Sequence, residues 1–465
     1  MSKPTYLRGF LGAACIVLLA VAGVHGAHMP VERIRQEIGI PRGVACVPNC
    51  GKGDIALDLA RHTEMLILAL DEDESDMAAV REAADTAGLL GRRLYVEKGK
   101  IDALPFADNY VDLIVFTDVA QGDLPEKART EMMRVLTPIR GRAVLADTVL
   151  RKPELPGSDW WPHKLHGPNN NPASADTVFR FPPITQFRAM PMYTSGMGAS
   201  LTVNGVHIEI NDWLFKTPMR SNLTGKIFAR SSYNGQILWQ DEAPARINAT
   251  TPTMAATDRM LLIASGTAPE IARWEVSSGE KLSAIMLDED ETARVNWLAH
   301  TDGILYALIG GEGRFKDPFS FYAGKPDAVS WYEGALAGTR LLAWSMEDNR
   351  LLWEHMETGP IDARNLAVCG GGLYFYTINR RMACLDRLTG ELLWENTEES
   401  WLTKLKRPDR LHNFYVGNMS SLNVADGFAR LAVAGCKEAM LFDATSGRLL
   451  TATKGGIQKS FIANG

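Results

Sequence analysis

Cysteine is scarce in this sequence, with six residues among 465, and these are scattered rather than clustered. A small secreted domain held by disulfides carries an even set of closely spaced cysteines, so that class is excluded. Cys46 and Cys50 lie four residues apart, but no pair of histidines stands near them to complete a metal site. We therefore expect the cysteines beyond residue 27 to be buried structural residues, with a disulfide or a metal site as the alternatives: Cys46, Cys50, Cys369, Cys384 and Cys436.

An excess of positive charge is also missing. The formal net charge is −6 and the pI is about 5.9. Proteins that bind nucleic acids or anionic membrane surfaces concentrate lysine and arginine for that purpose. We expect no nucleic-acid partner.

Long apolar runs are rare. A single one, at residues 10–24, follows Lys3 and Arg8 and precedes the small residues Gly26 and Ala27. This order is typical of a secretory signal peptide, and the run of about 15 residues is shorter than the roughly 20 that a spanning helix needs. We predict a signal peptide at 1–27 and a periplasmic or secreted protein. An uncleaved signal peptide is the one membrane anchor that we expect.

Glycine, by contrast, is plentiful, with 41 residues, and one glycine organises a hairpin motif at 383–394. Asp386 can bond turn amides through its side chain, Gly390 can supply a positive φ, and Trp394 closes the second strand. A single hairpin is not stable alone in water. The motif therefore needs neighbours of the same kind.

Four further segments repeat this pattern around turn positions 235, 279, 349 and 447. Position 349 is an asparagine, the residue that tolerates positive φ next best. The five turns are separated by 44, 70, 41 and 57 residues, and two of these steps match the roughly 40–45 residues of a four-stranded propeller blade. The sequence predicts a β-propeller over 184–465, with about five to eight blades in a closed or incomplete ring.

Strands and helices alternate in the preceding part of the chain, residues 28–150. This alternation indicates a mostly parallel sheet with helices on both faces, and hence an α/β domain in front of an all-β domain. Apolar runs predict strands at 43–47, 65–70, 94–96, 111–117 and 142–146, and helices at 53–62, 73–87 and 125–136.

This domain resembles the class I S-adenosylmethionine-dependent methyltransferases. Residues 44–54 are similar to the first motif of that family, 99–114 to its third- and fourth-strand region, and 131–145 to its fourth helix and fifth strand. The resemblance implies a Rossmann-like sheet and S-adenosylmethionine as the candidate cofactor. The residues that it places around that cofactor are Asn49, Gly51, Gly53, Asp71 and Asp102.

The first motif departs from the family pattern of an acid followed by three alternating glycines. Val47 stands in place of the acid and Asn49 in place of the first glycine, while Pro48 stiffens the loop and removes a backbone donor. Lys100 replaces the acid that meets the adenine in the family. The domain is therefore a degenerate relative, and we assign no catalytic residue to it.

The junction at 151–183 is rich in proline and predicts an irregular segment. His163 and His166 are spaced as two metal ligands could be, but no third ligand is evident, so we expect them to pack against or cap the propeller. We assign no metal site.

The repeats resemble the pyrroloquinoline-quinone (PQQ) repeat, whose signature is Asp, two residues, Thr, Gly, two residues, Leu, Trp. The copy at 386–394 matches it fully. The resemblance implies that the closing tryptophans pack between adjacent blades, and that the Trp-led segment at 159–172 precedes the first blade. Quinone-dependent dehydrogenases of this family add an adjacent cysteine pair and often a Cys-x-x-Cys-His motif, and this sequence has neither. We do not expect PQQ to bind.

These patterns together predict an exported two-domain protein whose propeller is a binding scaffold for a protein or polysaccharide partner. S-adenosylmethionine is made inside the cell, so a domain behind a cleaved signal peptide would work without it. Two enzymes are the alternatives: an active S-adenosylmethionine-dependent methyltransferase first, and a quinoprotein oxidoreductase second.

Overall fold

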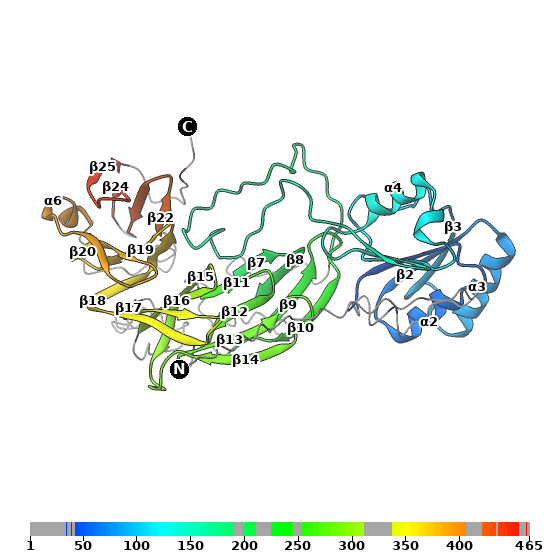
Figure 1. The fold of residues 1–465 in the computed structure, drawn as a ribbon, viewed down its shortest axis with the longest axis horizontal. Helices are drawn as coiled ribbons and strands as arrows, with labels where there is room; N and C mark the ends of the chain where they lie inside the picture. The colour runs from blue at the N-terminus through cyan, green and yellow to red at the C-terminus, as the bar shows by residue number, and fades with distance from the viewer. Residues whose placement is uncertain are drawn as a thin grey trace, which may run out of the picture.

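The computed structural model describes residues 34, 39, 42–189, 199–210, 225–244, 253–266, 268–310, 337–405, 421–433, 436–454 and 462. An α/β domain lies at one end of an elongated molecule, and antiparallel sheets make up the rest (Figure 1). The signal peptide predicted at 1–27 and the C-terminal glycines lie outside the described residues. Among the residues that are described, no helix has the length and apolar character needed to cross a bilayer.

The α/β domain contains a six-stranded sheet in the order β3-β2-β1-β4-β5-β6. The first five strands run parallel, and β6 pairs antiparallel with β5. Every strand and helix predicted for this domain is present within a few residues of its expected bounds. The elements are β1 (Val44–Pro48), α2 (Asp54–His62), β2 (Leu66–Asp71), α3 (Glu74–Thr86), β3 (Leu94–Lys98), β4 (Leu113–Phe116), the 3₁₀ turn η1 (Gln121–Asp123), α4 (Glu126–Val135), β5 (Arg142–Leu145) and β6 (Val149–Arg151).

Helices cover both faces of this sheet. One core contains Leu59 of α2 and Val80 of α3, and the other contains Met132 of α4. The side chain of Asp73 caps α3 by accepting hydrogen bonds from the backbone N–H groups of Ser75 and Asp76, which satisfies orphan donors of the first turn. The fold is the expected one for alternating strands and helices.

The sheet ends in an antiparallel hairpin. β6 follows β5 through a tight turn, with Leu145 N–H donating to Thr148 O at 2.8 Å, so no helix separates the two strands. β6 ends at Arg151, so the irregular segment begins at residue 152, one residue later than the predicted start of the junction. From Lys152 to Ala189 the described chain then has no helix or strand of its own.

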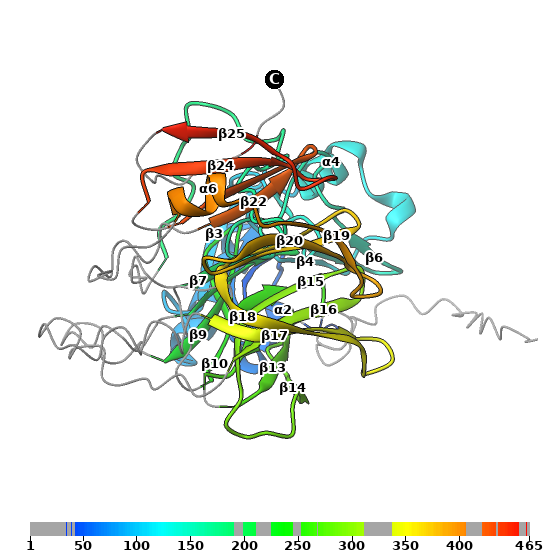
Figure 2. The ribbon, with the colours of Figure 1, turned by 90° about the vertical axis from the view of Figure 1, so that its left-hand side faces the viewer.

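Five four-stranded antiparallel units follow, which we call blades 1 to 5. The described residues thus contain every predicted repeat (Figure 2). Blades 3 and 4 share β18, whose first part is the outer strand of one and whose last part is the inner strand of the other. Blade 1 is β7 (Ala199–Val203), β8 (Val206–Ile210), β9 (Lys226–Ser231) and β10 (Ile237–Glu242), and blade 2 is β11 (Met254–Ala256), β12 (Met260–Ala264), β13 (Glu270–Glu275) and β14 (Lys281–Met286). Blades 3 and 4 are β15 (Arg294–Thr301), β16 (Ile304–Gly310), β17 (Ala337–Ser345), β18 (Arg350–Cys369), β19 (Gly372–Thr377), β20 (Arg381–Asp386) and β21 (Leu392–Asn396). Blade 5 follows α6 (Glu399–Leu402) and the 3₁₀ turn η3 (Thr403–Leu405), and it is β22 (Ser421–Ala425), β23 (Phe428–Ala432), β24 (Glu438–Asp443) and β25 (Leu449–Lys454).

The predicted turn register holds in all five blades. Each turn position lies between the third and fourth strands of its blade, and each has a positive φ, including Asn349 at 51°. In blade 4 the Asp386 carboxylate accepts hydrogen bonds from the N–H groups of Leu388 and Thr389. The role predicted for Asp386 is therefore confirmed.

The closing tryptophans pack between blades, as expected. The indole N–H groups of Trp239, Trp353 and Trp394 each donate to a carbonyl of another blade, and in each case this carbonyl lies three residues before that blade's turn glycine. A Cβ at Gly447 would lie 2.3 Å from the Trp394 ring. In blade 1 this place beside Gly235 is taken by Phe187, which lies between the junction and β7.

Candidate functional site

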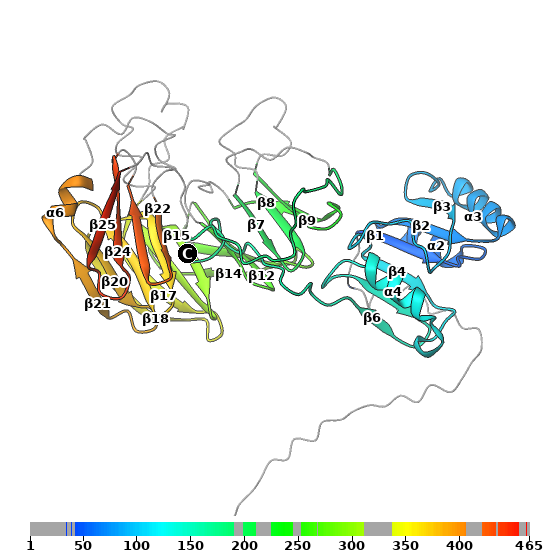
Figure 3. The same cartoon turned by 90° about the horizontal axis from the view of Figure 1, so that it is seen from above.

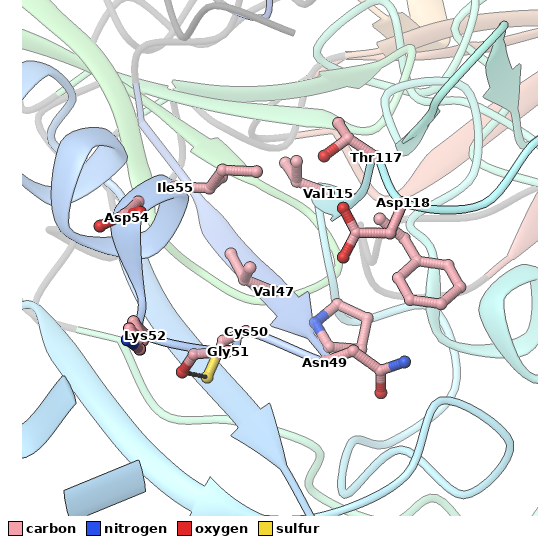
Figure 4. Close-up of a pocket in the computed structure, with 12 residues that line it drawn as sticks. Val47, Asn49, Cys50, Gly51, Lys52, Asp54, Ile55, Val115, Thr117 and Asp118 are labelled. Carbon is pink, nitrogen blue, oxygen red and sulfur yellow. Dashed lines mark hydrogen bonds between the residues drawn. The ribbon is translucent and has the colours of Figure 1, made fainter. Parts of the chain in front are cut away.

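The α/β domain has an open cavity of about 180 Å³ at the carboxyl ends of β1 and β4 (Figure 4). This is the edge at which parallel α/β sheets bind ligands. The cavity is smaller than the roughly 300–1,000 Å³ of pockets that enclose a whole small molecule. Its walls come from the loop between β1 and α2 and from the end of β4: Val47, Pro48, Asn49, Cys50, Gly51, Lys52, Asp54, Ile55, Val115, Phe116, Thr117 and Asp118.

Two of the five predicted cofactor residues line this cavity. Asn49 and Gly51 lie in the β1–α2 loop with φ of 49° and 51°. Gly53 does not line it but allows close helix packing, because a Cβ there would lie 2.7 Å from a methyl carbon of Val80 in α3. The β1–α2 loop therefore has the positive-φ backbone that its glycines predict.

Asp71 stands at the end of β2, where it was predicted, but its carboxylate is occupied by the protein backbone. One oxygen accepts a hydrogen bond from Gly51 N–H at 2.8 Å. The other accepts from Glu72 N–H at 2.8 Å and Asp73 N–H at 3.0 Å. Asp71 therefore ties the β1–α2 loop to β2 and is not among the residues that line the cavity.

Two charged residues that follow β3 form ion pairs with other side chains of the protein. Lys100 lies 2.7 Å from a carboxylate oxygen of Glu72, and the bond to this carboxylate raises the pKa of Lys100. Asp102 lies 2.9 Å from Lys127 of α4, and that contact lowers the pKa of Asp102. Neither Lys100 nor Asp102 lines the cavity. Asp102 is thus held toward α4.

Sequence reasoning did not assign the cavity residues Cys50, Thr117 and Asp118 as ligands. Burial raises the pKa of the Cys50 thiol to about 11, so it is protonated at neutral pH. The Thr117 hydroxyl oxygen is buried and makes no hydrogen bond in the described structure, and the next residue, Asp118, also lines the cavity. Their position directly after an apolar strand was the available signal, because such positions meet at one edge of a parallel sheet.

The cysteines of the described chain are all free. Cys46, Cys384 and Cys436 are buried, while Cys50 and Cys369 are partly buried. The expectation of buried structural cysteines holds fully for the first three.

A second site lies where the propeller sheets converge. Residues 161–171, which we call the axial segment, contact the inner strand of every blade. Trp161 pairs with Thr202 of β7, His163 pairs with Ala255 of β11, and His163 Nε2 accepts a hydrogen bond from His300 N–H of β15. The carbonyls of Pro168 and Asn169 accept from Val368 N–H of β18 and Val424 N–H of β22.

The asparagines of the axial segment complete these contacts. Asn170 donates to the carbonyls of Leu366 and Leu422, in two different blades. Asn171 exchanges two hydrogen bonds of 2.8 Å with the backbone of Ile462, near the C-terminus. Figure 1 shows the chain after β6, residues 152–189, running from the α/β domain to near β22 and back toward blade 1. The axial segment is therefore an integral part of the propeller.

The two histidines of this segment have structural partners. His163 is 4% exposed, and burial lowers its pKa to about 3, so it is neutral. His166 lies 2.8 Å from the Asp159 carboxylate and edge-on to Trp161. Across the described residues, no three His, Cys, Asp or Glu side chains gather as a metal site would require. The predicted packing role is what the structure shows for both histidines.

Comparison with known proteins gives one family match. Residues 49–139 match the model of the methyltransferase domain family. No protein of curated function matches the chain.

Several solved structures resemble parts of the chain. A candidate S-adenosyl-L-methionine-dependent methyltransferase from Methanococcus maripaludis is 26% identical over 24% of this chain and 52% of its own, with a TM-score of 0.23. BamB from Moraxella catarrhalis is 14% identical over 55% of this chain and 60% of its own, with a TM-score of 0.34. Geranyl diphosphate C-methyltransferase from Streptomyces coelicolor is 14% identical over 24% of this chain and 43% of its own, with a TM-score of 0.23.

The chain thus spans about half to three fifths of the length of the first two of these proteins. The family match and the parallel sheet agree on the nature of the first domain, and the repeated four-stranded sheets with their inter-blade tryptophans define the second. The chain joins a methyltransferase-like α/β domain to a PQQ-repeat-type β-propeller.

Proposed function

We propose that the protein is an exported binding scaffold whose methyltransferase-like domain serves as a structural module. The observation that carries this proposal is the state of Asp71. Its two carboxylate oxygens accept three backbone N–H groups. These bonds use three of the roughly four acceptor sites of the carboxylate and hold the β1–α2 loop and the chain before α3, so a ribose would have to compete with the backbone for Asp71.

The surroundings of Asp71 support the same reading. The volume of the cavity, about 180 Å³, is below that of pockets that enclose a whole small molecule. Lys100 is paired with Glu72 at the place where the family carries an acid. In the described part of the α/β domain, β5 is followed only by the antiparallel β6, so no further helix or parallel strand is present there to form a substrate pocket.

The propeller offers its outer strands to a partner, since the axial segment contacts the inner strands. Outer strands present unpaired backbone groups, to which an extended segment of another protein can add. Large apolar side chains are exposed on them: Met286 on β14 is 51% exposed, Met356 on β18 is 64% exposed and Leu393 on β21 is 55% exposed. This character favours a protein partner over a polysaccharide.

A second candidate is an active methyltransferase, which the family match over 49–139 and the cavity at β1 and β4 favour. Asn49 and Gly51 would then hold the cofactor, and Asp71 would turn from Gly51 toward the ribose. The quinoprotein alternative gains no support, because a quinone on the propeller axis would have to displace residues 161–171.

Calorimetry on the full chain separates the first two candidates. With S-adenosylmethionine or its demethylated product we expect no saturable heat at concentrations up to about 100 μM. Saturable binding in that range, lost in Asp71→Ala and kept in Asp85→Ala, would establish the methyltransferase instead. Asp85 is a matched control because it is an exposed aspartate on α3.

The partner and the compartment need their own experiments. A photo-crosslinking residue at position 393 should give one discrete protein adduct in cells, whereas the same residue at the exposed position 95 on β3 should give none. Equal adducts at both positions would contradict the proposal, and a protease-resistant adduct at 393 would indicate a polysaccharide partner instead of a protein.

Alkaline phosphatase fused after residue 30 should be active if residues 1–30 direct export. An inactive fusion would remove the compartment argument and make the methyltransferase the leading candidate.

A further inference from the structure

Three arginines gather at the edge of the α/β sheet that is opposite the cavity. Arg142 of β5 and Arg151 of β6 are direct partners in the antiparallel register. Such residues project from the same face with Cβ atoms about 4.5–5.5 Å apart, and like charges in this arrangement destabilise a sheet. Arg140 precedes Arg142 by two residues.

No carboxylate of the described residues forms an ion pair with these arginines. Within the described chain, neither Arg140, Arg142 nor Arg151 has an acidic oxygen within 4.0 Å, although most other buried or half-buried arginines do. The Arg142 guanidinium donates to the carbonyls of Ile139 and Gly141 at 2.6 and 3.1 Å. These bonds orient the Arg142 guanidinium but supply no opposite charge, and among the described residues its buried Nε has no acceptor.

Arg140 is the second, independent observation. Its side chain is only 7% exposed, and its Nε is buried without a hydrogen-bond acceptor in the described structure. An arginine in such a place is costly unless an anion or an acceptor meets it. Among the described residues, Asp112 is the one acid whose charge influences Arg140, and these two side chains do not form an ion pair. The cluster therefore has three positive charges for one carboxylate.

The electrostatics of Arg142 agree with this crowding. Burial, Arg151 and Arg140 together lower the pKa of Arg142 to about 10. A bound anion removes that strain, because opposite charge within a few ångströms favours the protonated guanidinium.

We propose that Arg140, Arg142 and Arg151 bind an oxyanion of the phosphate class, either free or as a phosphate ester. Guanidinium groups present paired donors that match phosphate oxygens. The site lies at the amino end of β5, away from the cavity lined by Asn49 and Gly51. It is independent of the proposed scaffold function.

The location gives the anion a structural consequence. Arg140 lies beside blade 1, with its Cδ 3.7 Å from the position that a Cβ of Gly205 would occupy. The blade 1 residue Asn234 contacts Asp112 in the same region. An anion held by Arg140 would thus strengthen the contact between the two domains.

The test measures the thermal midpoint of the full chain in inorganic phosphate and in sodium chloride of equal ionic strength. We expect a saturable rise with phosphate alone. Arg142→Gln should weaken the apparent affinity about tenfold, the effect of losing one charge-assisted contact, while the exposed control Arg92→Gln should not change it. Equal effects of chloride and phosphate, or equal affinities in all three proteins, overturn the proposal.

Arg151→Gln gives a readout that does not depend on a fragile variant, because Arg151 is exposed. Without phosphate this variant should be more stable than the parent protein, since one repulsive charge is gone; with saturating phosphate the order should reverse. If the variant and the parent protein keep the same order of stability with and without phosphate, the proposed site is wrong.

Flotation with phosphatidylglycerol vesicles distinguishes the source of the anion. Arg151-dependent binding to these vesicles that phosphate inhibits would identify a lipid headgroup, whereas flotation equal to that with neutral vesicles would identify free phosphate.

Discussion

Replacing Asn234 by alanine should loosen the contact between the two domains more than any other single change in the turn of blade 1. Asn234 is 3% exposed, and its amide group donates to Tyr110 O at 2.9 Å and to Asp112 Oδ2 at 2.8 Å. Both acceptors belong to the α/β domain, which lies beside blade 1 (Figure 3). The same Asp112 oxygen accepts the N–H of Val44, the first residue of β1.

The size of the effect follows from these two bonds. A neutral hydrogen bond contributes about 0.5–1.5 kcal/mol and one to a charged group about 1.5–3 kcal/mol, so Asn234→Ala should cost about 2–4 kcal/mol. Because a 1.4 kcal/mol change is a factor of ten, the exchange of the Val44 amide hydrogen should accelerate by about thirtyfold to nearly a thousandfold.

The effect should depend on pH in a defined direction. Burial raises the pKa of Asp112, while Arg140 and the bonds from Val44, Asn234 and Thr137 oppose that rise. Loss of the Asn234 bond raises the pKa further, so the folded variant takes up a proton at a pH where the unfolded chain, with a pKa of about 3.9, does not. The destabilisation should be largest at neutral pH and should shrink as the pH falls toward about 4.

Hydrogen exchange of the β1 segment, followed by mass spectrometry on the full chain, measures this change without assuming that both domains unfold together. Thr389→Ala is the matched control, because Thr389 holds the same turn position in blade 4 and accepts the same local N–H from two residues on, as Asn234 does. If the two variants leave β1 equally protected, the docking role assigned to Asn234 is wrong.

Two further predictions concern the propeller. Gly447→Ala should destabilise blade 5 by more than Gly427→Ala, because both glycines have positive φ but only at position 447 would the new methyl group meet a tryptophan ring, that of Trp394; equal shifts in the thermal midpoint would contradict the packing argument. His163 has a folded pKa of about 3, below its unfolded value of about 6.5, so its contribution to stability is present above pH 6.5 and is lost as the pH falls toward 3. Denaturant titrations of His163→Leu should show less acid sensitivity than the parent, whereas the exposed control His62→Gln should behave like the parent.

The sequence was sufficient to predict the α/β elements and the blade turns, because both depend on local patterns. Apolar periodicity placed β1 and α2 within one residue, since each has to bury one face. Positive φ at Asn349 could be expected because few other residues tolerate it at a turn.

The axial contacts could not be predicted in this way. Asn170 bonds carbonyls that are 196 and 252 residues away in the chain. Backbone carbonyls are the same in every residue, so no sequence pattern identifies which of them an asparagine will reach. The sequence indicated that the segment was irregular, but its irregularity is the shape needed to meet five strands in turn.

The cavity was only partly predictable for a related reason. Asn49 and Gly51 follow an apolar strand directly, so their place at the sheet edge is a consequence of topology. The orientation of Asp71 depends on which backbone N–H groups its carboxylate meets after folding. That choice is made by the loop geometry, which residue identities alone do not specify.

The axial segment has a consequence for how this propeller can change in evolution. Blades usually multiply by duplication of a repeat, but here each inner strand needs its own contact within the eleven residues 161–171. A duplicated blade would arrive without such a partner, and a deleted one would leave an axial group unsatisfied in the interior. The number of blades is therefore specified by a segment that lies outside the repeats and is synthesised before any of them.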